Sequence, residues 1–220
     1  MKNRIVITID GPSAAGKGSL ARNLALYLDF AILDSGALYR AYAYFYNQGF
    51  SGIKIVQAIN ELVFIPAKDD MSIYYKDNEI TADIRNEEIA KTASKLSALS
   101  KTRELLIDIQ RNFMMGKNII ADGRDMGSVV FPDAELKIFL VASAEVRAKR
   151  RYLELQNRGQ KVNIQNLQED IKHRDLKDRT RTLSPLIPVS DSIVIDSSNL
   201  SQEEVLNLAK KQLSRVLSNE

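Results

Sequence analysis

The chain has 220 residues, of which 45% are hydrophobic and 27% charged, and its 31 basic and 28 acidic side chains give a net charge of +3. This composition is typical of a globular protein with one sizeable core. The small positive charge does not separate an anionic small ligand from a nucleic acid. Because the chain has no cysteine and a single histidine, His173, disulfide frameworks, thiolate metal sites and multi-histidine zinc sites are excluded.

The N-terminal region and the overall hydropathy bear on location. No apolar run is long enough to cross a bilayer, and the first strand begins too early to leave room for a signal peptide. We therefore expect a cytoplasmic protein. His173 lies among charged residues, which favours a solvated position on a helix.

The first predicted elements are an apolar strand at 5–9, a glycine-rich turn at 11–19 and an amphipathic helix. Gly11 and Gly16 can adopt positive φ and let the backbone wrap an anion. Loop N–H groups and the helix N-terminus would then point at phosphate oxygens, and Lys17 would add positive charge for the outer phosphates. The pattern G-x-x-x-x-G-K in this context predicts a loop that binds a nucleoside triphosphate, against the alternative of an ordinary strand–turn–helix.

The end of the loop departs from a common pattern. Gly18 follows the lysine and the hydroxyl comes one residue later, at Ser19, whereas many GTPases and motor ATPases have it directly after the lysine. No Asn-Lys-x-Asp motif occurs either, which argues against a regulatory switch. The order Gly-Lys-Gly-Ser resembles the phosphate loop of nucleoside monophosphate kinases.

The second predicted strand and helix carry the first candidate outside the loop. Residues 30–33 form a short apolar strand that ends in Asp34-Ser35-Gly36, a turn with an N-cap for a helix over 37–47. The aromatic residues of this helix fit a core better than a base-stacking platform. Arg40 lies one turn into the helix, at the sheet edge where open α/β proteins bind ligands, although a surface arginine is an equal alternative.

The next stretch changes in pattern. After a short helix at 54–61, tight turns at 69–70 and 77–78 separate three predicted strands, 62–65, 72–75 and 79–81. Short strands with tight turns predict a small antiparallel insert. Two helices follow, at 87–96 and 102–115, and contain Ser94 and Arg103, which alone would pass as surface residues.

An apolar strand at 118–122 ends in a carboxylate, Asp122, and leads into a turn that contains Arg124 and Asp125. In phosphate-transferring enzymes such a strand supplies an acid that helps to hold Mg²⁺. A salt-bridged Asp122 without a metal role is the alternative. After a strand at 137–141, a helix over 144–157 contains Arg147, Arg150 and Arg151.

The following helix ends in a run of charges, 172–181. A solvated face, a nucleic-acid stripe and a mobile arginine-rich flap over a polyphosphate all remain possible explanations. Because acids alternate with the bases and no aromatic residue interleaves, the flap fits best. A last strand at 192–195 precedes a helix that opens with the capping box Ser201-Gln202-Glu203-Glu204, has Leu200 and Val205 placed as a hydrophobic staple, and presents an apolar face that includes Leu208.

Taken together, these motifs resemble bacterial cytidylate kinases nearly from end to end. The resemblance rests on the loop with its preceding Ile9-Asp10, on Leu33-Asp34-Ser35-Gly36-Ala37-Leu38-Tyr39-Arg40, on Asp122-Gly123-Arg124-Asp125-Met126-Gly127 and on Arg174-Asp175 with Asp178, Arg179 and Arg181. The long insert before Asp122 also matches, and smaller relatives such as adenylate kinase lack it. Two small departures are Ala14, where the family often has glycine, and Ser19, where it prefers threonine.

The resemblance implies a role for each matching residue. Lys17, Arg124 and Arg181 would be catalytic. ATP would bind the loop and the flap cations, namely Gly11, Pro12, Ser13, Ala14, Ala15, Gly16, Lys17, Gly18, Ser19, Arg150, Arg151 and Arg158. CMP would bind through its phosphate to Ser35, Arg40, Arg124 and Arg181, through cytosine to Ser94, Arg103 and Asp125, and through ribose to Asp178 and Arg174. Mg²⁺, bound with ATP, would be held by Ser19 and Asp122, directly or through water.

The resemblance also implies the architecture and the reaction. The fold would be an α/β P-loop fold of three layers, with a mostly parallel sheet flanked by helices. A single domain, 1–220, would carry a nucleotide-binding insert at about 36–103 and an arginine-rich lid at about 147–181. The activity would be Mg-dependent transfer of phosphate from ATP to CMP or dCMP. We expect a monomer whose partners are small molecules, with no nucleic acid or membrane; UMP/CMP kinase and shikimate kinase are the nearest rivals.

Overall fold

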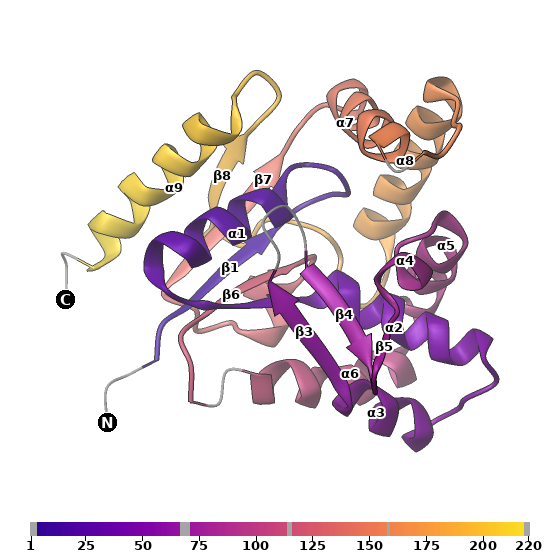
Figure 1. Ribbon diagram of the computed structural model, residues 1–220. Helices are drawn as coiled ribbons and strands as arrows, with labels where there is room; N and C mark the ends of the chain where they lie inside the picture. The colour runs from indigo at the N-terminus through magenta and orange to yellow at the C-terminus, as the bar shows by residue number, and fades with distance from the viewer. Residues whose placement is uncertain (1–3, 67–70, 114–115, 158, 218–220) are drawn as a thin grey trace. The chain divides into compact units, whose positions relative to one another are not determined.

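The computed structural model describes residues 4–66, 71–113, 116–157 and 159–217 (Figure 1). The chain divides into two compact units, of which one comprises Met1–Leu33 and Met114–Glu220 and the other Asp34–Phe113. The second unit contains the stretch 36–103 that the sequence predicts as an insert.

The first unit is built on a five-stranded sheet with the order β2-β6-β1-β7-β8. Its strands are β1 (Val6–Asp10), β2 (Ala31–Asp34), β6 (Ile119–Gly123), β7 (Leu136–Val141) and β8 (Ile193–Asp196). Strand β1 pairs in parallel with β6 and β7, and β7 pairs in parallel with β8. The register sets Asp10 opposite Gly123, so the two chain segments that follow β1 and β6 start side by side at one sheet edge.

Helices cover this sheet because its strands consist mostly of apolar residues, and its central strands require burial on both faces. Every residue of β1 is buried. A core cluster joins side chains of β1, β6, β7 and β8 to helices α1 (Lys17–Leu28) and α9 (Gln202–Leu217). The unit also contains α7 (Ala144–Asn157) and α8 (Ile164–Thr180), which pack against each other.

The second unit combines helices with a small antiparallel sheet. Its strands are β3 (Leu62–Pro66), β4 (Met71–Tyr75) and β5 (Asn78–Glu79), in the order β3-β4-β5. Its helices are α2 (Ser35–Asn47), α3 (Ile53–Asn60), α4 (Thr81–Ile84), α5 (Glu87–Leu96) and α6 (Ser100–Phe113). A core cluster of Ala37, Ile73, Ile80 and Ile84 joins α2 to β4 and α4.

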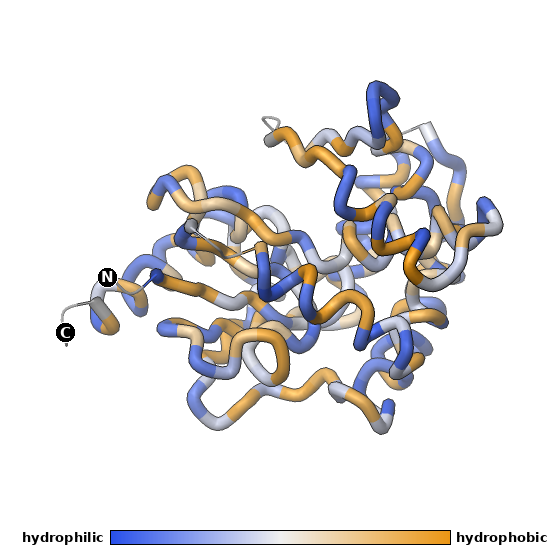
Figure 2. The backbone as a smooth tube through the Cα atoms, turned by 90° about the horizontal axis from the view of Figure 1, so that it is seen from below, coloured by the Kyte–Doolittle hydropathy of each residue, from blue (hydrophilic) through white to orange (hydrophobic). Residues whose placement is uncertain are grey.

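Helix ends and helix faces largely follow the sequence. The Asp34 carboxylate accepts a hydrogen bond from the Ala37 N–H and caps α2, as predicted. At α9, the Glu204 N–H donates to Ser201 Oγ and the Ser201 N–H donates to the Glu204 carboxylate, which confirms the capping box. Along the backbone, hydrophobic and hydrophilic stretches alternate, as expected of amphipathic helices with one buried side (Figure 2).

Several local predictions are wrong. The third short strand covers Asn78–Glu79 rather than 79–81, because the turn is at 76–77 and Thr81 already begins helix α4. A π-helical turn η1 (Met126–Val130) follows β6 where only a loop was expected. Leu208, expected on an apolar face, is 39% exposed, and Tyr46, one of the aromatic residues expected in the core, is 51% exposed. The expected turn at 69–70 lies outside the described residues.

The predicted fold class is confirmed: a mostly parallel central sheet flanked by helices in the first unit, and a small antiparallel sheet in the second. His173 is exposed on α8, as predicted. Across residues 4–66, 71–113, 116–157 and 159–217, no helix combines the length and the apolar composition needed to cross a membrane.

Candidate active site

The glycine-rich loop between β1 and α1 has the conformation that the sequence predicts. Gly11 and Gly16 have φ angles of 149° and 99°. A Cβ atom on Gly11 would lie 2.0 Å from the Leu140 carbonyl oxygen, so the close approach of the loop to β7 requires glycine. Ala14 has a φ of 60°, a left-handed conformation that is strained for a residue with a side chain.

Lys17 is the first residue of α1 and its side chain is 7% exposed. Its Nζ donates a hydrogen bond to the Pro12 carbonyl oxygen at 3.1 Å, and Asp122 Oδ1 lies 3.8 Å from the same Nζ. The ammonium is therefore folded back over the loop, with the carboxylate at the end of β6 as its counter-charge. This position suits a cation that would neutralise a phosphate bound in the loop.

Two arginines of α7 hold carbonyl groups of the loop. Arg147 Nη1 donates to the Ser13 oxygen at 3.3 Å, and Arg150 Nη1 donates to the Ala15 oxygen at 3.3 Å. Ser197, just after β8, donates its hydroxyl to the same Ala15 oxygen at 2.9 Å and accepts from Arg150 Nη1 at 3.0 Å. These bonds engage carbonyl oxygens that would otherwise repel a phosphate.

The other predicted flap cations differ in their surroundings. Burial lowers the pKa of Arg150, and the charge of Asp196 partly opposes this shift. Arg151 is half-buried and forms an ion pair with Glu154 at 2.8 Å within α7. The predicted ATP contact Arg158 lies outside the described residues. Contacts of Arg150 and Arg151 with ATP stay predictions.

Asp122 is the acid predicted to help hold a metal. Its Oδ2 would lie 3.5 Å from a Cβ on Gly18, so the start of α1 passes close to this carboxylate. Ser19 Oγ accepts a long hydrogen bond from Arg22 at 3.5 Å. No group of three acidic, histidine or cysteine side chains suited to a metal occurs within the part of the chain that the structure describes.

Three predicted residues meet where the turn after β6 approaches the end of α8: the guanidinium groups of Arg124 and Arg181 lie at the carboxylate of Asp178. Arg124 Nε donates to Asp178 Oδ2 at 3.4 Å, and Arg181 Nη1 lies 3.9 Å from Asp178 Oδ1. Asp178 is buried, and Arg181 is fixed further by a hydrogen bond from its Nε to the Ser184 carbonyl oxygen. Arg174 lies half-buried one helical turn before Asp178. Two guanidinium groups thus converge on one acid, an arrangement that would also suit a phosphate between them.

Asp125 and Asp10 are both buried at this end of the sheet, 3% and 7% exposed. Asp10 accepts hydrogen bonds from the N–H groups of Met126 and Gly127, each at 2.8 Å. Burial raises the pKa of Asp10 to about 6, and the nearby charge of Asp125 adds to this effect, while the two hydrogen bonds and the charge of Lys17 oppose it.

The remaining predicted residues belong to the second unit. On α2, the Ser35 hydroxyl donates to Gln110 Oε1 at 2.8 Å, and Arg40 Nη1 reaches the Ile84 carbonyl oxygen at 3.5 Å. Arg103 donates to the Ser97 carbonyl oxygen at 3.1 Å, and its guanidinium lies 5.9 Å from the centre of the Tyr39 ring.

Ser94 is half-buried on α5, and its carbonyl oxygen accepts from the Ser97 hydroxyl at 3.0 Å. The second unit therefore brings Arg103 next to the helix that carries Ser35 and Arg40, and links it to the end of the helix that carries Ser94. Their roles toward a ligand stay predictions.

Comparison with known proteins identifies the family. The family model described as cytidylate kinase matches residues 7–215. A cytidylate kinase of Pasteurella multocida (strain Pm70) is 43% identical and is aligned over 99% of this chain and 98% of its own. A cytidylate kinase of Photorhabdus laumondii subsp. laumondii is also 43% identical, over 97% of this chain and 96% of its own. The chain belongs to the cytidylate kinase family.

A solved structure with much lower sequence identity shares the fold. An uncharacterized protein from Eubacterium ventriosum ATCC 27560 matches with a TM-score of 0.57 at 9% identity, over 97% of this chain and 99% of that chain. Because the identity is so low, this likeness supports the architecture alone.

Sequence reasoning had assigned no role to four residues that contact the phosphate loop, the lid helices or the turn after β6: Asp10, Arg147, Asp175 and Ser197. A carboxylate at the end of an otherwise apolar buried strand was a signal for Asp10, since such a group needs partners. Arg147 and Asp175 were noticed only as members of charged runs. Nothing in the sequence pattern distinguishes Ser197 from its neighbouring serine.

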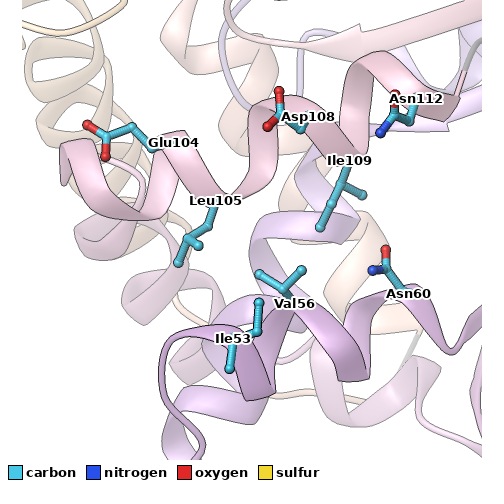
Figure 3. A pocket seen from close by; sticks show the side chains of 8 residues that line it. All are labelled: Ile53, Val56, Asn60, Glu104, Leu105, Asp108, Ile109 and Asn112. Atoms are coloured by element: carbon cyan, nitrogen blue, oxygen red, sulfur yellow. The ribbon is translucent and has the colours of Figure 1, made fainter.

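One pocket of about 350 Å³ has none of the predicted site residues in its lining. It is formed between α3 and α6, where Leu105 and Ile109 face Ile53 and Val56 (Figure 3). The rest of its lining consists of Asn60, Glu104, Asp108 and Asn112. Two carboxylates and an apolar floor do not suit a nucleotide phosphate, so this pocket is not a candidate for the active site of a cytidylate kinase.

Proposed function

We propose that the chain is an ATP-dependent cytidylate kinase that transfers the γ-phosphate of ATP to CMP or dCMP and releases ADP with CDP or dCDP. The observation that carries the proposal is that one unit contains both a lysine-bearing phosphate loop and the Arg124–Asp178–Arg181 cluster. A loop of this kind suits a triphosphate donor, and a pair of arginines suits a second phosphate. Family membership adds CMP as the acceptor.

The ATP side of the proposal uses the loop. The backbone N–H groups of the non-proline residues within 11–19 would surround the triphosphate, and Lys17 would neutralise the transferring group. Arg150, Arg151 and Arg158 would contribute from the lid at 147–181. Support comes from the hydrogen bonds of Arg147 and Arg150 to the Ser13 and Ala15 carbonyl oxygens, which tie the start of that lid to the loop.

The CMP side of the proposal assigns each part of the nucleotide to residues of matching chemistry. Arginines suit the CMP phosphate because a guanidinium can bind two phosphate oxygens at once. We propose Ser35, Arg40, Arg124 and Arg181 for this phosphate. Cytosine would be recognised by Ser94, Arg103 and Asp125, and the ribose by Asp178 with Arg174.

The chemistry needs no protein nucleophile. An oxygen of the CMP phosphate attacks the γ-phosphorus in line, and the bond to the β–γ bridging oxygen breaks as ADP leaves. The protein must align two anions, neutralise their charge and exclude water, which would otherwise accept the phosphoryl group. Lys17, Arg124 and Arg181 would supply the neutralising charge, and Asp178 would hold the two arginines in place.

Magnesium fits the residues available. Mg²⁺ prefers oxygen ligands and commonly uses one or two carboxylates with nucleotide phosphates and waters, so a single acid beside the loop is sufficient. Asp122 and Ser19 would hold it, directly or through water, and the ion would neutralise charge on the bound phosphates.

We further propose that the enzyme acts on these small molecules as a monomer, without nucleic acid, in pyrimidine nucleotide metabolism of the cytoplasm. A coupled assay of ADP release tests the activity with CMP, dCMP, UMP, AMP and shikimate as acceptors. We expect the highest kcat/KM with CMP or dCMP. Preference for UMP or shikimate would overturn the proposed acceptor, and ADP release at the same rate with and without an acceptor would indicate an ATPase.

A further inference from the structure

Asp10 connects the strand before the phosphate loop to the turn that carries Arg124 and Asp125. Its two carboxylate oxygens accept from separate N–H groups, Oδ1 from Met126 and Oδ2 from Gly127, each at 2.8 Å. Asp10 is 7% exposed and Met126 is fully buried. The Asp10 side chain thus accepts hydrogen bonds from two buried backbone N–H groups that lie much later in the sequence.

These two donors need an acceptor from outside their own turn. Within the π-helical turn η1, the N–H groups of Val129 and Val130 donate to the Asp125 carbonyl oxygen, and that of Phe131 donates to Met126. The first N–H groups of any helix have no acceptor within the helix. Because this turn is buried, water cannot replace the missing acceptor, and the Asp10 carboxylate fills that role.

The two loops that Asp10 joins are held in different ways. Strand β1 pairs with β6 on one side and β7 on the other, so a double ladder fixes the start of the phosphate loop without any help from the Asp10 side chain. The turn after Gly123 has left the ladder, since the β1–β6 pairing ends at Asp10 and Gly123. Its orientation therefore depends on contacts such as those with Asp10.

We propose that Asp10 is a positioning residue for the acceptor nucleotide: it orients η1 and thereby aims Arg124 and Asp125, which precede η1 directly. This inference rests on the proposed CMP-binding role of those two residues. Asp10 itself would touch neither substrate. Its loss should weaken CMP binding while ATP binding stays close to normal.

A carboxylate is required here for a chemical reason. It is acceptor-only and can serve both N–H groups at once. An asparagine of the same shape would accept one of them and turn its own amide hydrogens toward the other, which leaves a buried donor opposed by a donor. Asp10→Asn therefore removes one hydrogen-bond acceptor and one negative charge with almost no change of volume.

Thr8 provides a matched control. It lies two residues earlier on β1, so its side chain is on the same face of the sheet, and it is fully buried. Among the described residues, its Oγ1 has no hydrogen-bond partner. A Cβ on Gly127 would lie 2.8 Å from that Oγ1, so Thr8 contacts the same turn. Thr8→Val disturbs the same packing without removing a hydrogen bond.

The experiment measures the dissociation constants of CMP and ATP separately by calorimetry, together with the melting temperature, in wild type, Asp10→Asn and Thr8→Val. We expect Asp10→Asn to weaken CMP binding about tenfold, because the turn would shift to satisfy the unpaired N–H group and would move Arg124 and Asp125 with it. ATP binding should change much less, because the two β-ladders, and not the Asp10 side chain, hold the start of the phosphate loop. Thr8→Val should leave both constants near those of wild type. Where Asp10→Asn does not fold, Asp10→Glu carries the test, because it keeps the charge but displaces the turn by one methylene.

The outcomes separate this inference from the proposed function. Wild-type protein that does not bind CMP would refute the proposed function itself. If the wild-type protein binds CMP and the Asp10 variant binds it equally well, only the role of Asp10 is refuted. Equal weakening of ATP and CMP binding, or a lower melting temperature with unchanged CMP binding, would mean that Asp10 acts in general stability rather than in positioning.

Discussion

Arg147 and Asp175 join α7 to α8 through two parallel hydrogen bonds, Nη1–Oδ1 at 3.0 Å and Nη2–Oδ2 at 2.5 Å. The same guanidinium also donates to the Ala142 and Ser13 carbonyl oxygens. The side chain of Arg147 is 4% exposed and that of Asp175 is 15% exposed. A single buried cation therefore links the predicted lid helices to each other and to the phosphate loop.

Asp175→Ala should destabilise the protein by about 3 kcal/mol, because it leaves a buried guanidinium without its carboxylate. Denaturant unfolding of wild type and variant measures this difference. Glu169→Ala is the matched control, since Glu169 is an exposed acid on the same helix and its loss should change the free energy of unfolding little. Equal effects of the two substitutions would contradict a structural role of the pair.

Lys17→Met should fold normally and lose most transfer activity, by about 10²–10³ in kcat, because a positioned charge in a water-excluded site makes a contribution of this size. The measurement is steady-state turnover with CMP and ATP, with circular dichroism as the check on folding. Lys172→Met removes an exposed lysine from α8 and should leave turnover unchanged. Near wild-type turnover in Lys17→Met would show that Lys17 does not act in the transfer and would contradict the assignment of the loop.

Asp125→Ala should narrow the preference for CMP over UMP. A carboxylate accepts hydrogen bonds only, so it would pair with the cytosine amine but would face the uracil carbonyl oxygen. An unpaired group in a closed site costs ~1–3 kcal/mol, which corresponds to roughly tenfold discrimination or more. The measurement is the ratio of kcat/KM for CMP and UMP, with the exposed Asp133→Ala as control. If Asp125→Ala keeps the full preference, Asp125 does not read the base.

The raised pKa of Asp10 predicts a pH dependence of stability. The folded-state pKa of about 6 exceeds the ordinary value of 3.8, so the folded protein binds more protons between these values. The contribution of this group is therefore complete below about pH 4 and is lost as pH rises through 6, by on the order of 1 kcal/mol per pH unit. The free energy of unfolding, measured with denaturant across this pH range, should fall more steeply with pH in wild type than in Asp10→Asn. Parallel curves would contradict the raised pKa.

CMP and ATP together should protect the backbone amides of 147–181 from hydrogen exchange more than either ligand alone. The reason is the density of arginines in this stretch, which phosphate charge from both substrates would order. Exchange measured by mass spectrometry with each ligand and with both tests this, and α9 provides a reference segment away from the predicted site. Unchanged exchange in 147–181 with both ligands present would indicate a static surface.

Much of the fold follows from sequence periodicity, since strands and helices with one buried face leave a clear pattern. The failures have physical causes. Helix α4 has four residues, which is too short to produce a helical repeat, and Thr81 resembles the end of a strand. The π-helical turn at Met126–Val130 has no characteristic spacing, so its apolar residues were indistinguishable from a loop.

The parts of the candidate site that a local sequence motif defines could be predicted. The parts that depend on a single contact between distant residues could not. The loop geometry followed from Gly11 and Gly16, because their positions require positive φ. The link from Asp10 to Gly127 spans more than a hundred residues and depends on the parallel pairing of β1 with β6. No local pattern contains that information.

Ala14 leaves the phosphate loop less stable than its backbone path allows. Its left-handed φ of 60° costs alanine on the order of 1–2 kcal/mol relative to glycine in the folded state. Glycine would remove this cost but would give the unfolded chain more freedom, which costs about 0.4–1 kcal/mol. The strain is the larger of the two effects, so Ala14→Gly is a route to a more stable loop of the same shape.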